Sequence, residues 1–182
     1  MIGLRALGVS GSPRANGNSD SAVMEALAVA QAAGYRIEFQ RLADYRIKHC
    51  TGCRGCMTAG QCVIRDDELE AAFNPWRDAQ LIILGSPVYW NSPSGVLKDF
   101  MDRTHGWYRD GGVLDGRTAM LLSIATASGF EPHNNAITSW LTHYGAKVTA
   151  VVDVLACELG DFNANPGAIR AVREAVERGL PT

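Results

Sequence analysis

The chain alternates five times between a short apolar segment and a longer amphipathic segment, and this alternation restricts the possible folds most strongly. The central apolar run, QLIILG at residues 80–85, is continuous, which is typical of a strand buried on both faces. Strands that alternate with helices form parallel β-α-β units with helices on both sides of the sheet. We therefore expect an α/β fold, a three-layer doubly wound sheet of five parallel strands. The expected strands span residues 4–10, 35–42, 80–85, 117–124 and 146–155.

The segments between these strands carry apolar residues at spacings of three and four, as amphipathic helices do. Three acids at residues 66–68 favour a helix start, because a helix N-terminus is the positive end of its dipole. Pro75 is expected to disturb the end of that helix. Asp99, Asp102 and Arg103, on the next helical segment, are interpreted as surface or interface charges.

The overall composition excludes several classes of protein. With 182 residues and a formal net charge of −2, the chain is expected to be a single domain over residues 1–182 with no basic face for nucleic acid. No apolar run approaches the roughly 18–20 residues that cross a bilayer, so no membrane partner is expected. The N-terminal residues lack a signal-peptide pattern, and a cytoplasmic location is therefore expected.

Ligands of doubly wound sheets bind at the carboxyl ends of the strands, which directs attention to the loop after the first strand. This loop resembles neither G-x-G-x-x-G nor a P-loop, so a dinucleotide or a nucleoside triphosphate is disfavoured. Its hydroxyl, amide and guanidinium groups suit a terminal phosphate monoester held without a metal. The alternative is a glycine- and asparagine-rich turn without a ligand. The candidate residues are Ser10, Ser12, Arg14, Asn16, Asn18 and Ser19.

The loop after the central strand is aromatic and bounded by prolines. Tyr89 and Trp90 stand side by side between Pro87 and Pro93. Such a loop is stiff and can cover a flat heterocycle while it presents backbone N–H groups to the polar rim. The alternative for both aromatic residues is simple packing beneath the loop.

Four of the five cysteines fall in one loop at residues 44–65, with the spacing C-x2-C-x2-C-x5-C over Cys50, Cys53, Cys56 and Cys62. The compact spacing is similar to that of ferredoxin-type cluster loops, whereas zinc sites more often use two separated pairs. Gly52 and Gly55 between the thiols are expected to allow positive φ and a close approach to sulfur. An iron–sulfur cluster, a zinc site, and cluster-free thiols or a disulfide all stay open.

Other conspicuous residues receive less weight. His105 and His133 are expected near the site, without a required catalytic role. Trp107 and Tyr108 are interpreted as lining an entrance or a subunit contact, or as surface packing. Cys157 stands apart from the other cysteines and is interpreted as a packed or half-buried thiol.

Three motifs together resemble a known family. Residues 10–18, SGSPRANGN, resemble the FMN-phosphate loop of the NADPH-dependent FMN reductase-like branch of the flavodoxin-like superfamily. Residues 85–90, GSPVYW, followed by LKDFMDR at 97–103, match the second FMN loop and its helix in that branch. The cysteine loop, closed by CVIRDD at 62–67, resembles that of the iron–sulfur flavoprotein subgroup.

The resemblance implies a flavodoxin-like strand order 2-1-3-4-5, bound FMN, reduction by NADPH or NADH, and a homodimer or homotetramer. It assigns the phosphate to the six candidates of the first loop. It assigns a possible [4Fe-4S] cluster to Cys50, Cys53, Cys56 and Cys62. It places two further groups around the isoalloxazine ring: Pro87, Val88, Tyr89, Trp90 and Asn91 from the second loop, and Thr126, Ala127, Ser128 and Gly129 from the third.

The expected function is an FMN-dependent NAD(P)H oxidoreductase. It would reduce a small acceptor, such as a quinone, a nitro compound or a flavin, by ping-pong hydride transfer. The flavin carries this chemistry, so no catalytic side chain is assigned. The alternative is an FMN/[4Fe-4S] electron-transfer flavoprotein that passes electrons between protein partners. A non-enzymatic binding module on the same fold is a third reading.

Overall fold

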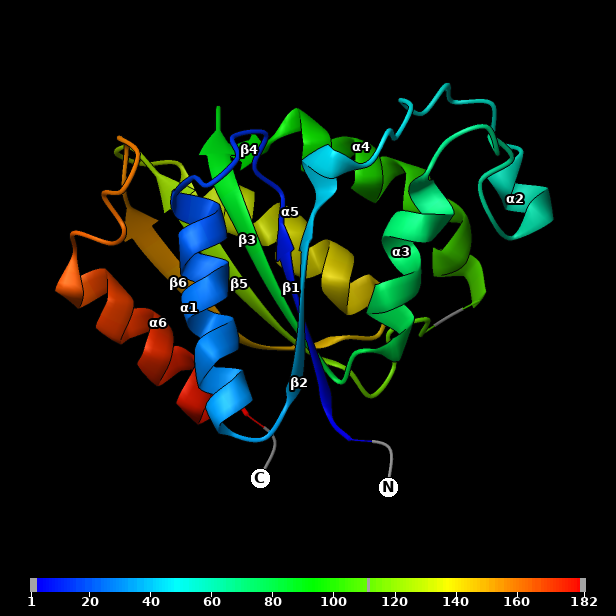
Figure 1. Cartoon of the computed structure of the whole chain (residues 1–182). Coiled ribbons are helices and arrows are strands. Elements are labelled where there is room, and N and C mark those ends of the chain that lie inside the picture. Colours follow the sequence, from blue (N-terminus) through cyan, green and yellow to red (C-terminus); the bar gives the residue numbers. More distant parts are fainter. Residues whose placement is uncertain (1–2, 111, 181–182) are drawn as a thin grey trace.

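The computed structural model describes residues 3–110 and 112–180 and contains one twisted sheet in the order β2-β1-β3-β5-β6 (Figure 1). All neighbours along this path are parallel. A sixth, two-residue strand, β4, lies outside this path and pairs antiparallel with the end of β3, which is why the last two strands of the path are numbered β5 and β6. The predicted five-stranded sheet and its order are therefore confirmed. The strands are β1 Arg5–Ser10, β2 Arg36–Arg41, β3 Leu81–Tyr89, β4 Ser92–Pro93, β5 Thr118–Ala125 and β6 Lys147–Leu155.

Helices cover both faces of the sheet, with α1 and α6 on one side and α3, α4 and α5 on the other (Figure 1). The short α2 belongs to the cysteine loop, which projects from the body of the molecule. No helix within the described residues is long and apolar enough to cross a membrane. The helices are α1 Asn18–Ala32, α2 Cys56–Ala59, α3 Leu69–Asp78, α4 Gly95–Arg103, α5 Phe130–His143 and α6 Pro166–Gly179.

Alternate residues of the central strands pack into two cores. Ile82 and Leu84 of β3 face the layer of α3, α4 and α5, whereas Leu81 and Ile83 face α1 and α6, and all four are fully buried. Burial on both faces explains why this strand is continuously apolar in sequence. The result is a rigid sheet whose carboxyl edge carries the candidate loops.

The α3, α4 and α5 layer differs from expectation in two places. Pro75 lies inside α3 and does not end it; Phe73 and Trp76, both fully buried, pack the helix against the core on either side of the proline. Beyond α4 the chain turns into a 3-10 helix, η2 (Thr104–Asp110), that carries Trp107 into the core. Its ring stacks on Phe73 with centroids 4.3 Å apart, so Trp107 is neither an entrance nor a surface residue.

Candidate functional site

The three candidate loops converge at the carboxyl edge of the sheet. The N–H of Gly11 donates to the carbonyl oxygen of Gly85 at 2.8 Å, and the Ser94 hydroxyl donates to the carbonyl oxygen of Gly11 at 2.5 Å. The third loop approaches the second so closely that a Cβ on Gly129 would lie 2.5 Å from Asn91 Oδ1. Residues far apart in sequence thus meet at one edge of the sheet.

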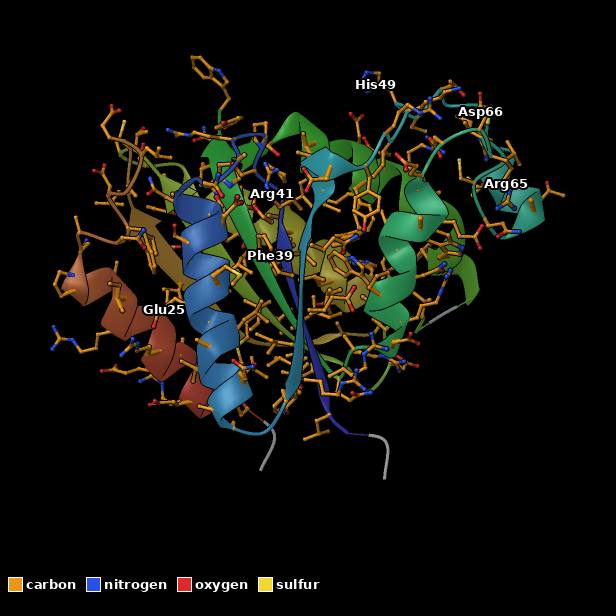
Figure 2. All side chains as sticks on the ribbon, viewed as in Figure 1. Glu25, Phe39, Arg41, His49, Arg65 and Asp66 are labelled. Atoms are coloured by element: carbon orange, nitrogen blue, oxygen red, sulfur yellow. The ribbon has the colours of Figure 1, made fainter. Side chains whose placement is uncertain are left out.

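Asp20 organises the first loop. This buried carboxylate accepts hydrogen bonds from the Ser10 hydroxyl at 2.5 Å, the Asn16 N–H at 2.8 Å and the Arg41 Nε–H at 3.1 Å. Arg41 lies at the end of β2 beside the loop (Figure 2). Sequence reasoning missed Asp20, although an acid in the first turn of a helix was a usable signal.

The six predicted phosphate residues divide into two groups. Ser10, Ser12, Asn18 and Ser19 are all buried. The side chains of Ser10 and Asn18 are already bonded within the protein, because Ser10 donates to Asp20 and Asn18 bonds to the carbonyl oxygen of Glu158 and to the N–H of Phe162. The others lie around the start of α1, where the N-cap Gly17 supplies no side chain. The first N–H groups of a helix have no partner within the helix, so this end of α1 offers donors to an anion.

The second loop is a two-residue hairpin turn with unusual backbone geometry. Trp90 and Asn91 both have positive φ, +52° and +61°. They lie between Tyr89, the last residue of β3, and Ser92, the first residue of β4, which pair with each other. Positive φ costs a non-glycine residue roughly 1 kcal/mol or more. A two-residue hairpin turn commonly requires it at both central residues. Trp90 is 99% exposed and Tyr89 46%, so neither packs beneath the loop.

The third loop leads into α5 and contains exposed residues 126–128. Gly129, at φ +93°, caps the helix in a left-handed conformation and closes against the second loop. The contact of these residues with a flavin ring stays a prediction.

A buried polar chain lies under the second and third loops. His133 of α5 is fully buried, with Nε2 3.0 Å from the Ser86 hydroxyl and Nδ1 3.2 Å from the Ser123 hydroxyl. Asn134 extends the chain by donating to Asp153 of β6 at 2.8 Å. Burial lowers the pKa of His133 and outweighs the opposing effects of its polar neighbours. The neutral imidazole therefore ties β3, β5 and α5 together just below the candidate flavin loops.

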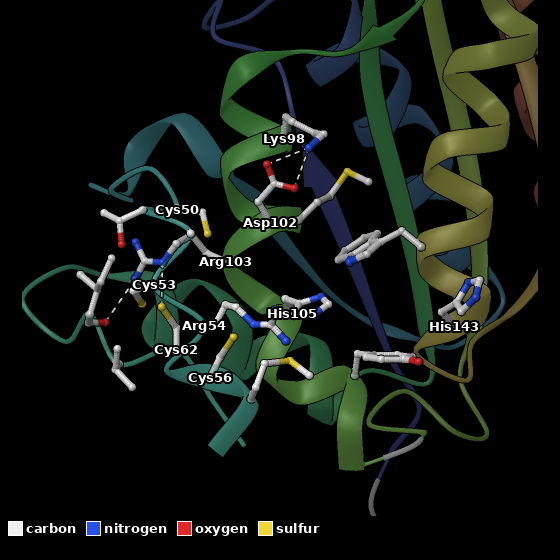
Figure 3. Close-up of a pocket in the computed structure, with 18 of the residues that line it drawn as sticks. Cys50, Cys53, Arg54, Cys56, Cys62, Lys98, Asp102, Arg103, His105 and His143 are labelled. Carbon is white, nitrogen blue, oxygen red and sulfur yellow. Dashed lines mark hydrogen bonds and ion pairs between the residues drawn. The ribbon is translucent and has the colours of Figure 1, made fainter. Parts of the chain in front are cut away.

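The four clustered cysteines line one cavity of about 950 Å3 between the cysteine loop, α4, η2 and α5 (Figure 3). All four are free thiols, and Cys50 and Cys53 are exposed. Hydrogen bonds from the Gly55 N–H and the Thr51 hydroxyl lower the pKa of Cys53. Within the described residues, no three His, Cys, Asp or Glu side chains lie close enough together to hold a metal ion.

Two cysteine-related expectations are wrong. Gly52 has positive φ, +67°, as predicted, but Gly55 caps α2 in the right-handed region at φ −57°, and its missing side chain makes room for Val63. Cys157 is exposed and not packed. It lies in a tight turn after β6, where the Asp161 carboxylate accepts its N–H at 2.9 Å.

Arg103 also contradicts its interpretation as a surface charge. Its side chain is 0% exposed and pairs with the 1% exposed carboxylate of Asp67 at 2.6 Å. Burial alone would raise the pKa of Asp67, but hydrogen bonds from Arg103 and from the N–H groups of Lys48 and Leu69 hold that pKa below its ordinary value. His49 and Arg65, by contrast, lie on the outside of the cysteine loop (Figure 2).

Comparison with known proteins finds a family match over most of the chain. The sequence profile of the NADPH-dependent FMN reductase family matches residues 4–158, which include all three loops and the cysteine loop. The chain belongs to this family. Of the helices and strands in the described part of the chain, α6 alone lies outside the matched region.

Curated relatives of this family member include several iron-sulfur flavoproteins. One from Methanocaldococcus jannaschii is 42% identical over 101 residues, 56% of this chain and 52% of the relative. One from Archaeoglobus fulgidus is 28% identical over 172 residues, 94% of this chain and 84% of the relative. The chain spans about half the length of the first curated relatives that it matches, 52% and 45%.

Solved structures support the fold. The structure of RosB with a bound riboflavin-phosphate intermediate has a TM-score of 0.77 at 16% identity, covering 97% of this family member and 77% of that chain. A flavodoxin from Streptococcus pneumonia has a TM-score of 0.61 at 12% identity, covering 96% of each chain. The flavodoxin-like fold is therefore shown.

Replacing Asp20 with Ala should weaken FMN binding at least tenfold, or about 1.4 kcal/mol. The change removes the acceptor that joins Ser10, Asn16 and Arg41, so the first loop loses its fixed shape. Fluorescence titration of apoprotein with FMN measures the dissociation constant. Glu25→Ala is the matched control. Glu25 lies on the same helix and forms an ion pair with Arg173, away from the first loop, so this variant should bind FMN like the wild type. Equal affinities for the two variants would contradict this role of Asp20.

Acidification below pH 6.5 should destabilise the fold through His133. The pKa of this histidine is lowered in the folded state, so the unfolded chain binds its proton first as the pH falls through about 6.5. Stability is full above that pH and decreases by at most about 1.4 kcal/mol per pH unit below it. Urea unfolding at several pH values measures this slope. His133→Gln should flatten it, whereas His143→Gln, at an exposed position of α5, should leave it intact.

Proposed function

We propose that this protein is an FMN-dependent oxidoreductase that takes electrons from NADPH or NADH and reduces a small acceptor such as a quinone, a nitro compound or a flavin. The observation that carries the proposal is the convergence of three loops at the carboxyl edge, beside the uncapped start of α1. Membership in the FMN reductase family supports it.

Each of the three loops would bind a different part of FMN. Ser12, Arg14, Asn16 and Ser19, with the first N–H groups of α1, would bind the phosphate, while Ser10 and Asn18 keep the loop in shape. The second loop would line one side of the isoalloxazine ring and the third loop the other. Bound FMN would supply hydride acceptance and donation. The chain contributes orientation, backbone donors and an open aromatic rim at Tyr89 and Trp90.

A second candidate is an electron-transfer flavoprotein in which the cysteine loop holds a [4Fe-4S] cluster. It is favoured because four free thiols line one cavity and because relatives carry the name iron-sulfur flavoprotein. Four thiolates are the donor set that such a cluster requires. The thiol chemistry therefore fits, although the described side chains are not gathered into a metal-holding group.

An anaerobic visible spectrum before and after NADPH addition tests both candidates. A flavin spectrum that bleaches with NADPH, and recovers with a quinone, is expected for the reductase. Added broad absorbance, with about four iron atoms per chain, is expected for the cluster protein. FMN should bind more tightly than riboflavin, because riboflavin lacks the phosphate. A colourless protein that takes up no FMN would refute the proposal. The homodimer or homotetramer, the cytoplasmic location and the acceptor stay predictions.

A further inference from the structure

Arg103 directs every donor that it has toward the cysteine loop and its end. A guanidinium carries five N–H donors. Nε donates to the sulfur of Cys62 at 3.0 Å. Nη1 donates to the Lys48 carbonyl oxygen at 2.7 Å and to Asp67 at 2.6 Å. Nη2 donates to the Ile64 carbonyl oxygen at 3.2 Å and to Asp67 at 3.4 Å.

These contacts join the two ends of the loop. Lys48 precedes the first cysteine, and Ile64 and Asp67 follow the last, so one side chain from the end of α4 holds both ends together. Lysine could not replace it, because an ammonium lacks the planar fork that reaches several acceptors at once. The full burial of Arg103 makes the arrangement costly to disturb.

The four thiols are consequently not equivalent. Cys50 and Cys53 are exposed, and Cys56 begins the short α2. Within the part of the chain that the structure describes, Cys62 is the one of the four whose sulfur accepts a hydrogen bond from a cationic side chain. Its position is therefore set by the body of the protein and not by the loop alone.

We propose that Arg103 is a positioning residue that closes the cysteine loop and anchors the Cys62 sulfur through an N–H···S hydrogen bond. For a cluster held by these cysteines, the same bond would raise the reduction potential. Hydrogen bonds and positive charge at a ligand sulfur favour the reduced, more negative state. The raised potential rests on the cluster candidate under the proposed function, whereas the anchoring of Cys62 does not.

The first test uses the full chain kept free of iron by a chelator. Of the four Cys→Ala variants, Cys62→Ala should lower Tm the most, because it leaves a buried guanidinium N–H without an acceptor. Cys62→Ser should recover part of the loss, since its hydroxyl accepts a hydrogen bond. In an Arg103→Lys background, the excess effect of Cys62→Ala over Cys56→Ala should disappear. Equal losses for Cys62→Ala and Cys56→Ala in the wild-type background would overturn the anchoring.

The second test uses anaerobically reconstituted protein and measures the midpoint potential of the iron–sulfur signal. Arg103→Lys should shift the reduction equilibrium about tenfold toward the oxidised form, which is about 59 mV for one electron. Arg65→Lys, at an exposed arginine of the same loop, should leave the potential unchanged. An unchanged potential in Arg103→Lys would refute the claim that the hydrogen bond from Arg103 raises the reduction potential. A wild-type chain that takes up no iron would reject the cluster and its tuning together, and the Tm series would still decide the anchoring.

Discussion

Asp67→Ala should lower the free energy of unfolding by about 3–5 kcal/mol, because it leaves the charge of Arg103 buried without a counter-ion. The two side chains are 1% and 0% exposed and 2.6 Å apart. The carboxylate also accepts the N–H of Lys48 at 3.0 Å, and the loop would lose this contact. Chemical denaturation measures the change.

The neighbouring residue provides the control for Asp67. Asp66→Ala removes an exposed carboxylate paired with Lys48 and should change stability little, because such pairs are screened by water. Adding Arg103→Met to Asp67→Ala should restore part of the stability by removing the stranded charge. The pKa of Asp67 is lowered in the folded state, so its contribution is full above about pH 3.9 and lost as the pH falls further. A small loss in Asp67→Ala, equal to that in Asp66→Ala, would refute the buried pair.

Gly85→Ala should abolish high-affinity FMN binding, with a loss of at least tenfold, and destabilise the fold by about 2–3 kcal/mol. A Cβ at this position would lie 2.5 Å from Val23 Cγ2 and 3.1 Å from the Ser19 carbonyl oxygen. Because both atoms belong to the first turns of α1, the methyl group would push the predicted phosphate end of the helix away from β3. Titration with FMN and thermal unfolding measure the two effects.

Two variants separate this cause from a general effect of alanine. Gly95→Ala, where a Cβ meets nothing within 4 Å, should bind FMN normally. Val23→Ala combined with Gly85→Ala removes the nearest clashing atom and should recover part of the affinity. Unchanged FMN affinity in Gly85→Ala would show that the start of α1 does not hold the phosphate.

Local sequence signals were sufficient to predict the strands of the sheet, their order and the loops at its carboxyl edge. Continuous apolar runs identify buried parallel strands, and the chirality of β-α-β connections leaves few possible strand orders. The carboxyl-edge rule then selects the three loops that the structure joins through Gly11, Gly85 and Gly129.

Pairings between distant residues could not be inferred in the same way. Arg103 has Asp99 and Asp102 as helical neighbours, which makes it resemble a surface charge, but its true partner is 36 residues away. The hairpin between β3 and β4 escaped notice because its turn contains Trp90 and Asn91, where the usual signal is Asn-Gly. The ion pair depends on tertiary packing and leaves no periodic trace in the sequence.

The hairpin turn also gives the protein a built-in optical reporter. The chain has four tryptophans. Trp76 and Trp107 are buried and Trp140 is half-buried, whereas Trp90 is 99% exposed. The long-wavelength edge of the intrinsic emission therefore comes mainly from Trp90, and a water-borne quencher such as iodide reaches this indole first. A coloured planar molecule that settles on the second loop dims that edge selectively, so binding can be followed there without attaching a dye.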